Sequence, residues 1–298
     1  MQVSKIEVNH NLQEIKKHGA SDLPIAVYND DFSLFEEGYI RWHWHKELQI
    51  SYVLSDKICF YIDGKEIVLE PKNGIMFNAN VLHQIKPYNN NCSMFSIVFD
   101  SVFISPNNDS LIRKIYVEPI LNNSDFKFII LKNEVEWQKQ ILEYSKDINR
   151  IFKLKEYGHE LEIKNYLNLI WLTLVRNAGI NHENNNEISK YDEDRVKIAL
   201  KYINSNYSNN ISLSDIAKAA NISRSECCRS FKRVLKNTPF EYLMEYRILK
   251  SSHYLCNTNK SIANIAIDVG FNGISYYGKI FKKYMGCTPS QYRARYRK

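Results

Sequence analysis

The chain has 298 residues, of which 44% are hydrophobic and 24% are charged, and it carries a formal net charge of +7. This length leaves room for two domains, and the hydrophobic content is sufficient for a core in each. The first ten residues lack the apolar stretch of a signal peptide, and the longest apolar run, from Leu167, is too short to span a membrane, so we expect a cytoplasmic protein without a membrane partner.

Residues 20–105 are predicted to form short β-strands. Apolar residues alternate from Leu48 to Leu54 and from Ile58 to Ile62, and again at residues 67–69 and 75–77. Asp63-Gly64, which follows the second of these segments, is a dipeptide preferred in two-residue hairpin turns. Many short strands joined by tight turns indicate an all-β sandwich or barrel, which we assign to residues 1–130.

The segment RWHWHKELQ, residues 41–49, places two histidines one residue apart on a predicted strand. Together with IDGKEIVLEPKNGIMFNANVLHQI further along, it resembles a cupin. Catalytic cupins hold a metal ion with two histidines, a glutamate and a later histidine. The resemblance places four residues at these positions: His43, His45, Gln49 and His83.

Gln49 departs from that pattern, because a neutral amide is a poorer metal ligand than a carboxylate. The six cysteines form no CxxC pair, so we expect free thiols and no zinc site among them. We predict no metal, no cofactor and no catalytic residue. The four residues are instead expected to hydrogen-bond a small polar effector, such as a sugar; side chains that merely fill a closed barrel remain an alternative.

Residues 131–180 are predicted to be helical, with a wide apolar stripe formed by Leu161, Tyr166, Leu167, Ile170, Trp171 and Leu174. Such a stripe is usually part of a core. Residues 181–192 are polar and rich in asparagine, which predicts a linker. We assign residues 193–298 to a second domain.

That second domain contains an internal repeat. Two segments fifty residues apart share five residues at matching positions: Phe231, Lys232, Thr238, Pro239 and Tyr242 in the first, and Phe281, Lys282, Thr288, Pro289 and Tyr292 in the second. Each copy is predicted to form a helix, a tight turn and a second helix. The domain is also basic: from Lys190 onward, 20 Lys and Arg stand against 8 Asp and Glu, whereas residues 1–189 have 20 against 25.

Residues that favour helix starts and turns define these helices. Ser212 and Ser223 are predicted N-caps, and Glu226 is expected to complete a capping box with Ser223. Asn221 and Gly270 are predicted to turn the chain in the left-handed conformation. Asn272 is expected to cap the second helix of the second copy, and Thr238 and Thr288 are expected to begin the helices that follow each copy.

In a helix-turn-helix unit the second helix lies in the major groove of DNA. Cys227, Phe231 and Val234 are predicted to face inward in the first copy, and Tyr277, Ile280 and Phe281 in the second. Arg229 is the candidate for reading guanine, because its planar fork matches two acceptors on that base. Phosphate contacts are expected from Arg224, Lys232, Arg233, Lys282 and Lys283. The alternative is that these charged residues only keep the surface of the helix in contact with water, which would give the same sequence pattern.

The segment GFNGISYYGKIFKKYMGCTPSQYR, residues 270–293, and its upstream copy closely resemble the DNA-binding domain of the AraC/XylS family of bacterial transcription regulators. The resemblance covers about 105 residues. It implies two helix-turn-helix units joined by a long helix at about 239–256, entering successive major grooves. Base-facing positions of the family fall on Ser225, Cys228 and Arg229, and on Ile274, Ser275, Gly278 and Lys279. Gly278 stands where a polar residue is usual, which puts base contacts by the second unit in doubt.

The resemblance also implies that a cupin-like barrel senses the effector and that the helices after it make dimer contacts, here through the stripe on residues 161–174. We therefore expect an α+β multidomain chain: a cupin-like barrel with following helices, then an all-α domain with two helix-turn-helix units. The predicted function is a transcription activator, not an enzyme, that binds double-stranded DNA as a homodimer and contacts RNA polymerase. A metal-dependent cupin enzyme fused to a DNA-binding domain, or a DNA-binding factor without an effector, are the alternatives.

Overall fold

A computed structural model describes residues 6–35, 37–89, 91–179 and 187–296, without the side chains of residues 187–191. The chain divides into two compact units, residues 1–191 (the N-terminal unit) and residues 192–298 (the C-terminal unit). Each unit is described by itself. Within the described residues, no helix combines the length and apolarity needed to cross a membrane.

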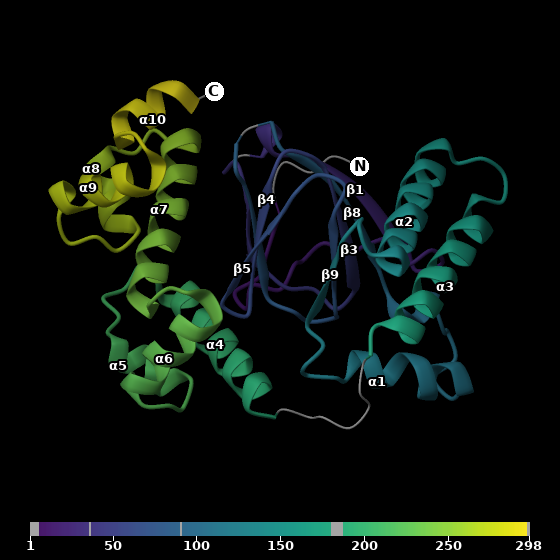
Figure 1. Cartoon of the computed structure of the whole chain (residues 1–298). Coiled ribbons are helices and arrows are strands. Elements are labelled where there is room, and N and C mark those ends of the chain that lie inside the picture. The colour runs from purple at the N-terminus through teal and green to yellow at the C-terminus, as the bar shows by residue number, and fades with distance from the viewer. Residues whose placement is uncertain (1–5, 36, 90, 180–186, 297–298) are drawn as a thin grey trace. The chain divides into compact units, whose positions relative to one another are not determined.

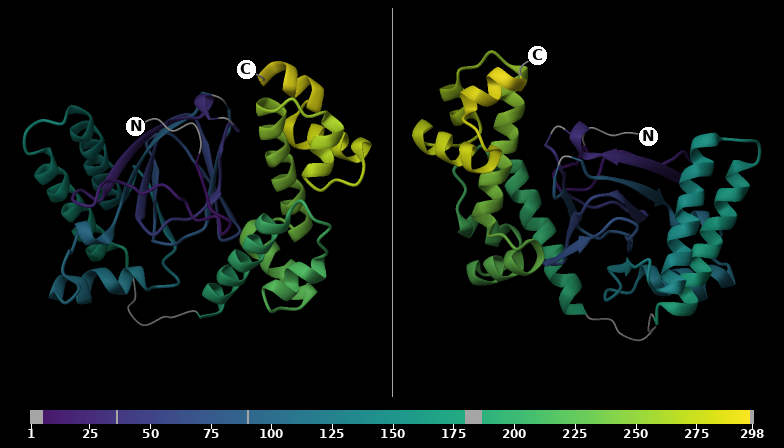
Figure 2. Two further views of the ribbon diagram at one scale, coloured as in Figure 1. Left: turned by 180° about the vertical axis from the view of Figure 1, so that it is seen from behind. Right: turned by 45° about the horizontal axis from the view of Figure 1, so that its top comes forward.

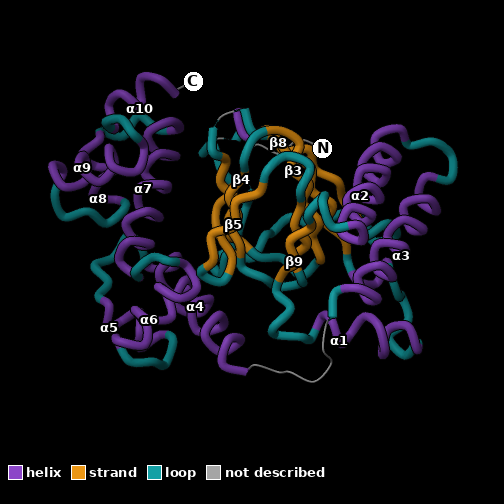
Figure 3. Tube along the Cα trace, viewed as in Figure 1, coloured by secondary structure: helices purple, strands orange, loops and turns teal. Residues whose placement is uncertain are grey.

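The N-terminal unit is built on two antiparallel sheets that face each other (Figures 1 and 3). The five-stranded sheet has the order β1-β8-β3-β6-β9, and the four-stranded sheet has the order β2-β7-β4-β5. The strands are β1 Ile25–Asp31, β2 Ile40–His43, β3 Leu48–Ser55, β4 Ile58–Ile62, β5 Lys65–Leu69, β6 Gly74–Phe77, β7 His83–Pro87, β8 Ser93–Phe99 and β9 Phe128–Leu131. The predicted turn at Asp63-Gly64 joins β4 to β5, and both residues have positive φ.

Strand β3 shows how the two faces of the larger sheet are used. Its alternate residues Leu48, Ile50 and Tyr52 belong to a core formed with the helices that follow the sheets. The intervening Gln49 and Ser51 face the space between the sheets, where they are also buried. The alternation predicted from the sequence is therefore confirmed, but both faces of β3 are covered. A second core lies between the sheets, around Phe60 and Phe77.

Helices α2 (Glu136–Leu154) and α3 (His159–Asn177) pack against the five-stranded sheet (Figure 1). Four residues of the stripe predicted to form a dimer contact are in this core and at most 4% exposed: Leu167, Ile170, Trp171 and Leu174. Their assignment to a contact with a second chain is corrected, because the chain's own sheet already covers them. Tyr166 is half-buried beside Tyr144, and Leu161 is 70% exposed.

The C-terminal unit is all-helical, and its central helix α7 has the other helices around its two ends (Figure 2). The helices are α4 Glu187–Asn206, α5 Leu213–Ala219, α6 Arg224–Leu235, α7 Pro239–Asn257, α8 Ile262–Asp268, α9 Ile274–Met285 and α10 Pro289–Tyr296. Helices α5 and α6 form the first helix-turn-helix unit, and α8 and α9 form the second. A short π-helical turn, Arg113–Val117, and α1, Glu118–Leu121, belong to the N-terminal unit.

Most of the predicted helix starts are confirmed. Ser212 forms a reciprocal capping box with Asp215, and Thr238 forms one with Glu241. Thr288 and Gln291 exchange the equivalent hydrogen bonds at the start of α10. Asn221 and Gly270 have positive φ at the two turns. These agreements follow from local chemistry, since each cap needs only residues three positions apart.

Two capping predictions were wrong in detail. Ser223 accepts a hydrogen bond from the Glu226 amide, but the Glu226 carboxylate pairs with Arg229 and does not return to the cap. Gly273, not Asn272, is the N-cap of α9, and no side chain caps it. Helix α4 begins at Glu187, so half of the predicted linker is helical; residues 181–186 of that linker lie outside the described residues.

Candidate DNA-binding surface and barrel pocket

Helix α6 separates an inward face from an exposed face. Cys227, Phe231 and Val234 are at most 2% exposed, as predicted. On the other side the structure places Arg224, Ser225, Arg229 and Lys232 at the surface, with Cys228 half-buried among them. This face therefore presents cationic and hydroxyl groups to solvent, which is the chemistry that binds phosphates and base edges.

Two arginines on α6 have acidic partners inside the unit. Arg229 pairs with Glu226 one turn earlier on the same helix. Arg233 pairs with Asp192 of α4, which is 3% exposed and also accepts a hydrogen bond from the Ser230 hydroxyl at 3.2 Å. Arg233 was predicted to contact phosphate, but its guanidinium is held by a buried carboxylate. The pair connects α6 to α4, and the Arg233 side chain remains 51% exposed, so its predicted phosphate contact stays a prediction.

Helix α9 has a similar division. Tyr277 and Phe281 are fully buried, whereas Ile280, predicted to face inward, is only half-buried. Ser275, Lys279, Lys282 and Lys283 are exposed, and Ile274 is 53% exposed. A Cβ added at Gly278 would meet no atom within 4 Å, so the backbone there is open to close approach. Tyr276, 54% exposed between these residues, was not singled out from the sequence.

A buried arginine, which the sequence did not reveal, joins the two helix-turn-helix units. Arg247 of α7 is 7% exposed, and its guanidinium donates hydrogen bonds to the carbonyls of Tyr207 at 2.7 Å and Asn209 at 2.8 Å. The same group lies 5.7 Å from the ring centre of Phe271, in the turn of the second unit. A Cβ at Gly270 would come within 2.8 Å of this guanidinium, so glycine is required there for space as well as for its positive φ.

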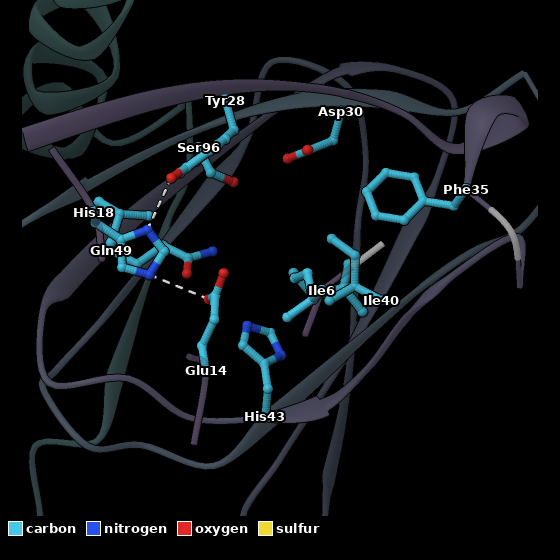
Figure 4. A pocket seen from close by; sticks show the side chains of 12 residues that line it. Ile6, Glu14, His18, Tyr28, Asp30, Phe35, Ile40, His43, Gln49 and Ser96 are labelled. Atoms are coloured by element: carbon cyan, nitrogen blue, oxygen red, sulfur yellow. Dashed lines mark hydrogen bonds and ion pairs between the residues drawn. The ribbon is translucent and has the colours of Figure 1, made fainter. Parts of the chain in front are cut away.

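A polar pocket lies between the two sheets of the N-terminal unit (Figure 4). It is small, with a cavity volume of about 30 Å³. The predicted residues His43 and Gln49 line it. The structure adds Glu14 and His18 from the segment before β1, Tyr28 and Asp30 from β1, and Ser96 from β8. His45 and His83 lie beside His43, with ring centres 5.8 Å and 4.2 Å from the His43 ring, so the four predicted residues are brought together.

Backbone carbonyls orient His43 at the end of β2, His83 at the start of β7, and His45 in the connection between β2 and β3. The Nδ1 atoms of His43, His45 and His83 lie 2.9 to 3.0 Å from the carbonyl oxygens of Arg41, Glu47 and Val81. The Nδ1 atoms of His43 and His83 therefore carry the proton, and their Nε2 atoms present lone pairs, whereas both ring nitrogens of His45 face oxygen atoms, the Glu47 carbonyl and Oε1 of Gln49. Nε2 of His83 is buried and has no hydrogen-bond partner among the described residues.

Burial keeps these rings neutral. It lowers the pKa of His43 to about 4, and it lowers the pKa of His83 well below the usual range. Burial and the neighbouring His18 lower the pKa of His45 in the same direction. Desolvation disfavours the charged imidazolium, and adjacent histidines repel a second positive charge.

The two carboxyl groups of the pocket differ. Burial alone would raise the pKa of Glu14, but a hydrogen bond with His18 holds it below its usual value, so Glu14 is ionised. His18 is 3.2 Å from Glu14 through Nε2 and 3.0 Å from the Tyr28 hydroxyl through Nδ1. Burial raises the pKa of Asp30 to about 7.

Gln49 belongs to a chain of buried polar groups. Its amide is 2.9 Å from Nε2 of His45 and 2.8 Å from the Ser51 hydroxyl, which is 3.0 Å from the Ser96 hydroxyl. Such a network is costly to leave incomplete in a low-dielectric interior. The pocket is thus built to hold polar groups in fixed positions, and no Lys or Arg is among the described residues that line it.

Comparison with known proteins agrees with this two-part structure. A family profile described as a helix-turn-helix domain matches residues 216–295. An uncharacterized HTH-type transcriptional regulator of Bacillus subtilis, YdeC, is 32% identical over 287 residues, which cover 96% of this chain and 97% of that protein. The melibiose operon regulatory protein of Escherichia coli K12 is 22% identical, over 84% of this chain and 82% of its own.

Among solved structures, a transcriptional regulator from Chromobacterium violaceum, described by its AraC-type DNA-binding domain, is 27% identical. It covers 37% of this chain and 96% of its own, with a TM-score of 0.34. The match to YdeC extends over nearly the whole of both chains and so includes the barrel as well as the repeated helices. The chain belongs to the AraC/XylS family and is a DNA-binding transcription regulator.

Proposed function

We propose that this regulator is an activator that binds its operator through α6 and α9 and responds to a small neutral effector in the barrel pocket. The observation that carries the proposal is the pairing of two exposed basic helices in one unit with a buried polar pocket in the other. The relatives reported above are transcription regulators, which favours a regulatory role over an enzymatic one. Residues 1–130 would sense the effector and residues 193–298 would bind DNA.

Arg229 of α6 would read a guanine, while Arg224, Lys232, Lys282 and Lys283 would contact phosphates. Their exposure supports these roles, as does the burial of the opposite face of each helix. Ser225, Cys228, Ile274, Ser275 and Lys279 would lie near base edges. Because α9 offers Gly278 and Ile274 at such positions, we expect it to contribute more to positioning and to the reading of DNA shape than to base-specific hydrogen bonds.

The effector would be a neutral polyhydroxy compound. His43, His45, Gln49 and His83 offer hydrogen-bonding groups, and Glu14 adds a negative charge that disfavours anionic ligands. The name of the melibiose operon regulatory protein makes sugars the first class to test. Homodimerisation remains part of the proposal, and on α3 the side chains available for it are the exposed Leu161, Leu169 and Leu172.

The test is to select bound fragments of the source genome with the purified protein, and then to measure operator affinity with and without neutral sugars. We expect one sugar to raise both the thermal unfolding midpoint and operator affinity, since a ligand stabilises the state that it binds. The variant Gln49→Leu should abolish the sugar effect and keep operator binding. Selection of no sequence motif would refute the DNA-reading role; a motif without any sugar effect would refute only the sensing role.

A further inference from the structure

We propose that α9 selects a thymine in the operator through contact between the Ile274 side chain and the 5-methyl group of that base, and that Gly278 provides the space for this contact. This role rests on the proposed function, because α9 must enter the major groove of DNA to perform it. Contact with a methyl group needs no hydrogen-bonding side chain, and neither Ile274 nor Gly278 has one.

Nothing within the described part of the chain requires a glycine at position 278. Gly278 lies in the interior of α9 without a positive φ, and a Cβ added to it would meet no atom of the described residues within 4 Å. Gly270 differs, because its positive φ and the nearby Arg247 guanidinium require glycine there. Glycine in a helix interior is destabilising relative to alanine. A bare backbone at position 278 is explained by a molecule that approaches α9 closely.

Ile274 supplies apolar surface beside this open space. It is the first residue of α9 and is 53% exposed, although isoleucine is usually buried. It precedes Gly278 by four residues, so the two residues are neighbours on one side of the helix. In a helix-turn-helix unit, residues near the N-terminus of the second helix contact base edges. Ile274 is thus placed to reach a base, and Gly278 lets the helix approach it.

Thymine is the base that matches this apolar surface. In the major groove thymine presents a methyl group, whereas the other bases offer hydrogen-bond donors and acceptors there. Isoleucine placed against a donor or acceptor would leave that polar group unpaired, which is unfavourable. Contact with a methyl group instead removes apolar surface of both partners from water. Ile274 therefore favours thymine over the other three bases.

The matching helix of the first unit has different chemistry at these positions. Helices α6 and α9 are both 12 residues long and begin at residues 224 and 274, so Arg224 and Cys228 stand where α9 has Ile274 and Gly278. Arg224 is exposed and charged, and Cys228 is half-buried. We therefore expect the two units to select different bases, and the operator to consist of two unlike elements.

The first experiment uses the full-length protein and the operator selected from the source genome. Each thymine of the operator is replaced, one at a time, by deoxyuridine, which lacks only the 5-methyl group. The wild type should lose about fourfold in affinity at one thymine, as expected when one methyl group is no longer removed from water. Ile274→Ala should bind the thymine and deoxyuridine forms of that operator equally. Ile198→Ala, at an exposed isoleucine of α4, should keep the difference.

A second variant separates close approach to DNA from the stability of the helix. Gly278→Ala should raise the thermal unfolding midpoint, because alanine is a better helix former than glycine. It should nevertheless lower operator affinity, because the added methyl group occupies space that the base requires. A glycine with a merely structural role would not give these opposite changes.

Three outcomes overturn this inference and leave the proposed function standing. The wild type could bind every deoxyuridine operator as tightly as the thymine operator, Ile274→Ala could show the same deoxyuridine effect as the wild type, or Gly278→Ala could keep full operator affinity. Selection of no operator sequence in the first place overturns the proposed DNA-reading role and this inference together.

Discussion

Glu226 and Arg229 form an ion pair on the exposed face of α6, one helical turn apart. At an exposed site such a pair contributes little to stability, because water and salt screen it. The pair instead affects how the Arg229 guanidinium is oriented, because it directs the group along the helix towards the Glu226 carboxylate. Arg229 would have to leave this carboxylate before both of its donors could reach a base. The negative charge also opposes the approach of phosphates. We therefore expect Glu226 to weaken non-specific binding of DNA while it orients the proposed base-reading group.

Replacing Arg229 with alanine should weaken binding to the selected operator by about 1–3 kcal/mol and relax the preference at one base pair. The reason is the loss of a two-donor contact with guanine. Glu226→Gln should instead raise affinity, and should do so for all DNA sequences, because it removes a negative charge near the DNA. Gel-shift titrations on the operator and on single-base variants measure both. Equal, small effects of Arg229→Ala on every sequence would contradict the base-reading role.

Lys282→Ala should lower affinity for operator and unrelated DNA alike, because Lys282 is exposed on α9 and is assigned to phosphate. The slope of log affinity against log salt should become shallower by about 1, which corresponds to one fewer released counterion. Lys153→Ala, an exposed lysine of α2 in the N-terminal unit, is the matched control. A sequence-dependent loss with an unchanged salt slope would show that Lys282 reads bases instead.

The helix-turn-helix repeat could be predicted from the sequence because its signals are local. The caps at Ser212, Ser223 and Thr238 need partners only three residues away, and Asn221 and Gly270 occupy turns that require positive φ. The same reasoning failed at α9, where an asparagine that suits a cap precedes the true N-cap by one residue.

The remaining features depend on contacts between distant segments. The apolar stripe of α3 predicted a buried face, but not whether the chain's own sheet or a second chain would cover it. Glu14 and His18 lie in an irregular segment without periodicity, so nothing in their spacing places them opposite β2 and β3. Arg247 looked like one of many charges on a long helix, and only the folded structure shows its carbonyl partners forty residues upstream.

Arg247→Met should destabilise the C-terminal unit by about 1–3 kcal/mol, since it leaves the carbonyls of Tyr207 and Asn209 without their donors in a buried site. The substitution should also loosen the second unit relative to the first. An operator with one extra base pair between the DNA segments contacted by α6 and α9 should lose affinity for the wild type. We expect this loss of affinity to be smaller for Arg247→Met. Arg295→Met, at an exposed position of α10, should leave stability unchanged. If the inserted base pair lowers the affinity of Arg247→Met as much as that of the wild type, Arg247 stabilises its surroundings but does not fix the second unit relative to the first.

Asp30 should make the stability of the N-terminal unit depend on pH. Burial raises the pKa of its carboxyl from 3.8 to about 7, so between these values the unfolded chain loses a proton that the folded chain keeps. Stability contributed by the protonated group is complete below about pH 4 and falls as the pH rises towards 7, by at most about 1.4 kcal/mol per pH unit. Asp30→Asn cannot ionise. Its thermal unfolding midpoint should therefore rise relative to the wild type from pH 5 to pH 8, whereas the exposed Asp125→Asn should track the wild type. A constant difference between Asp30→Asn and the wild type across that range would mean that Asp30 is already ionised at pH 5.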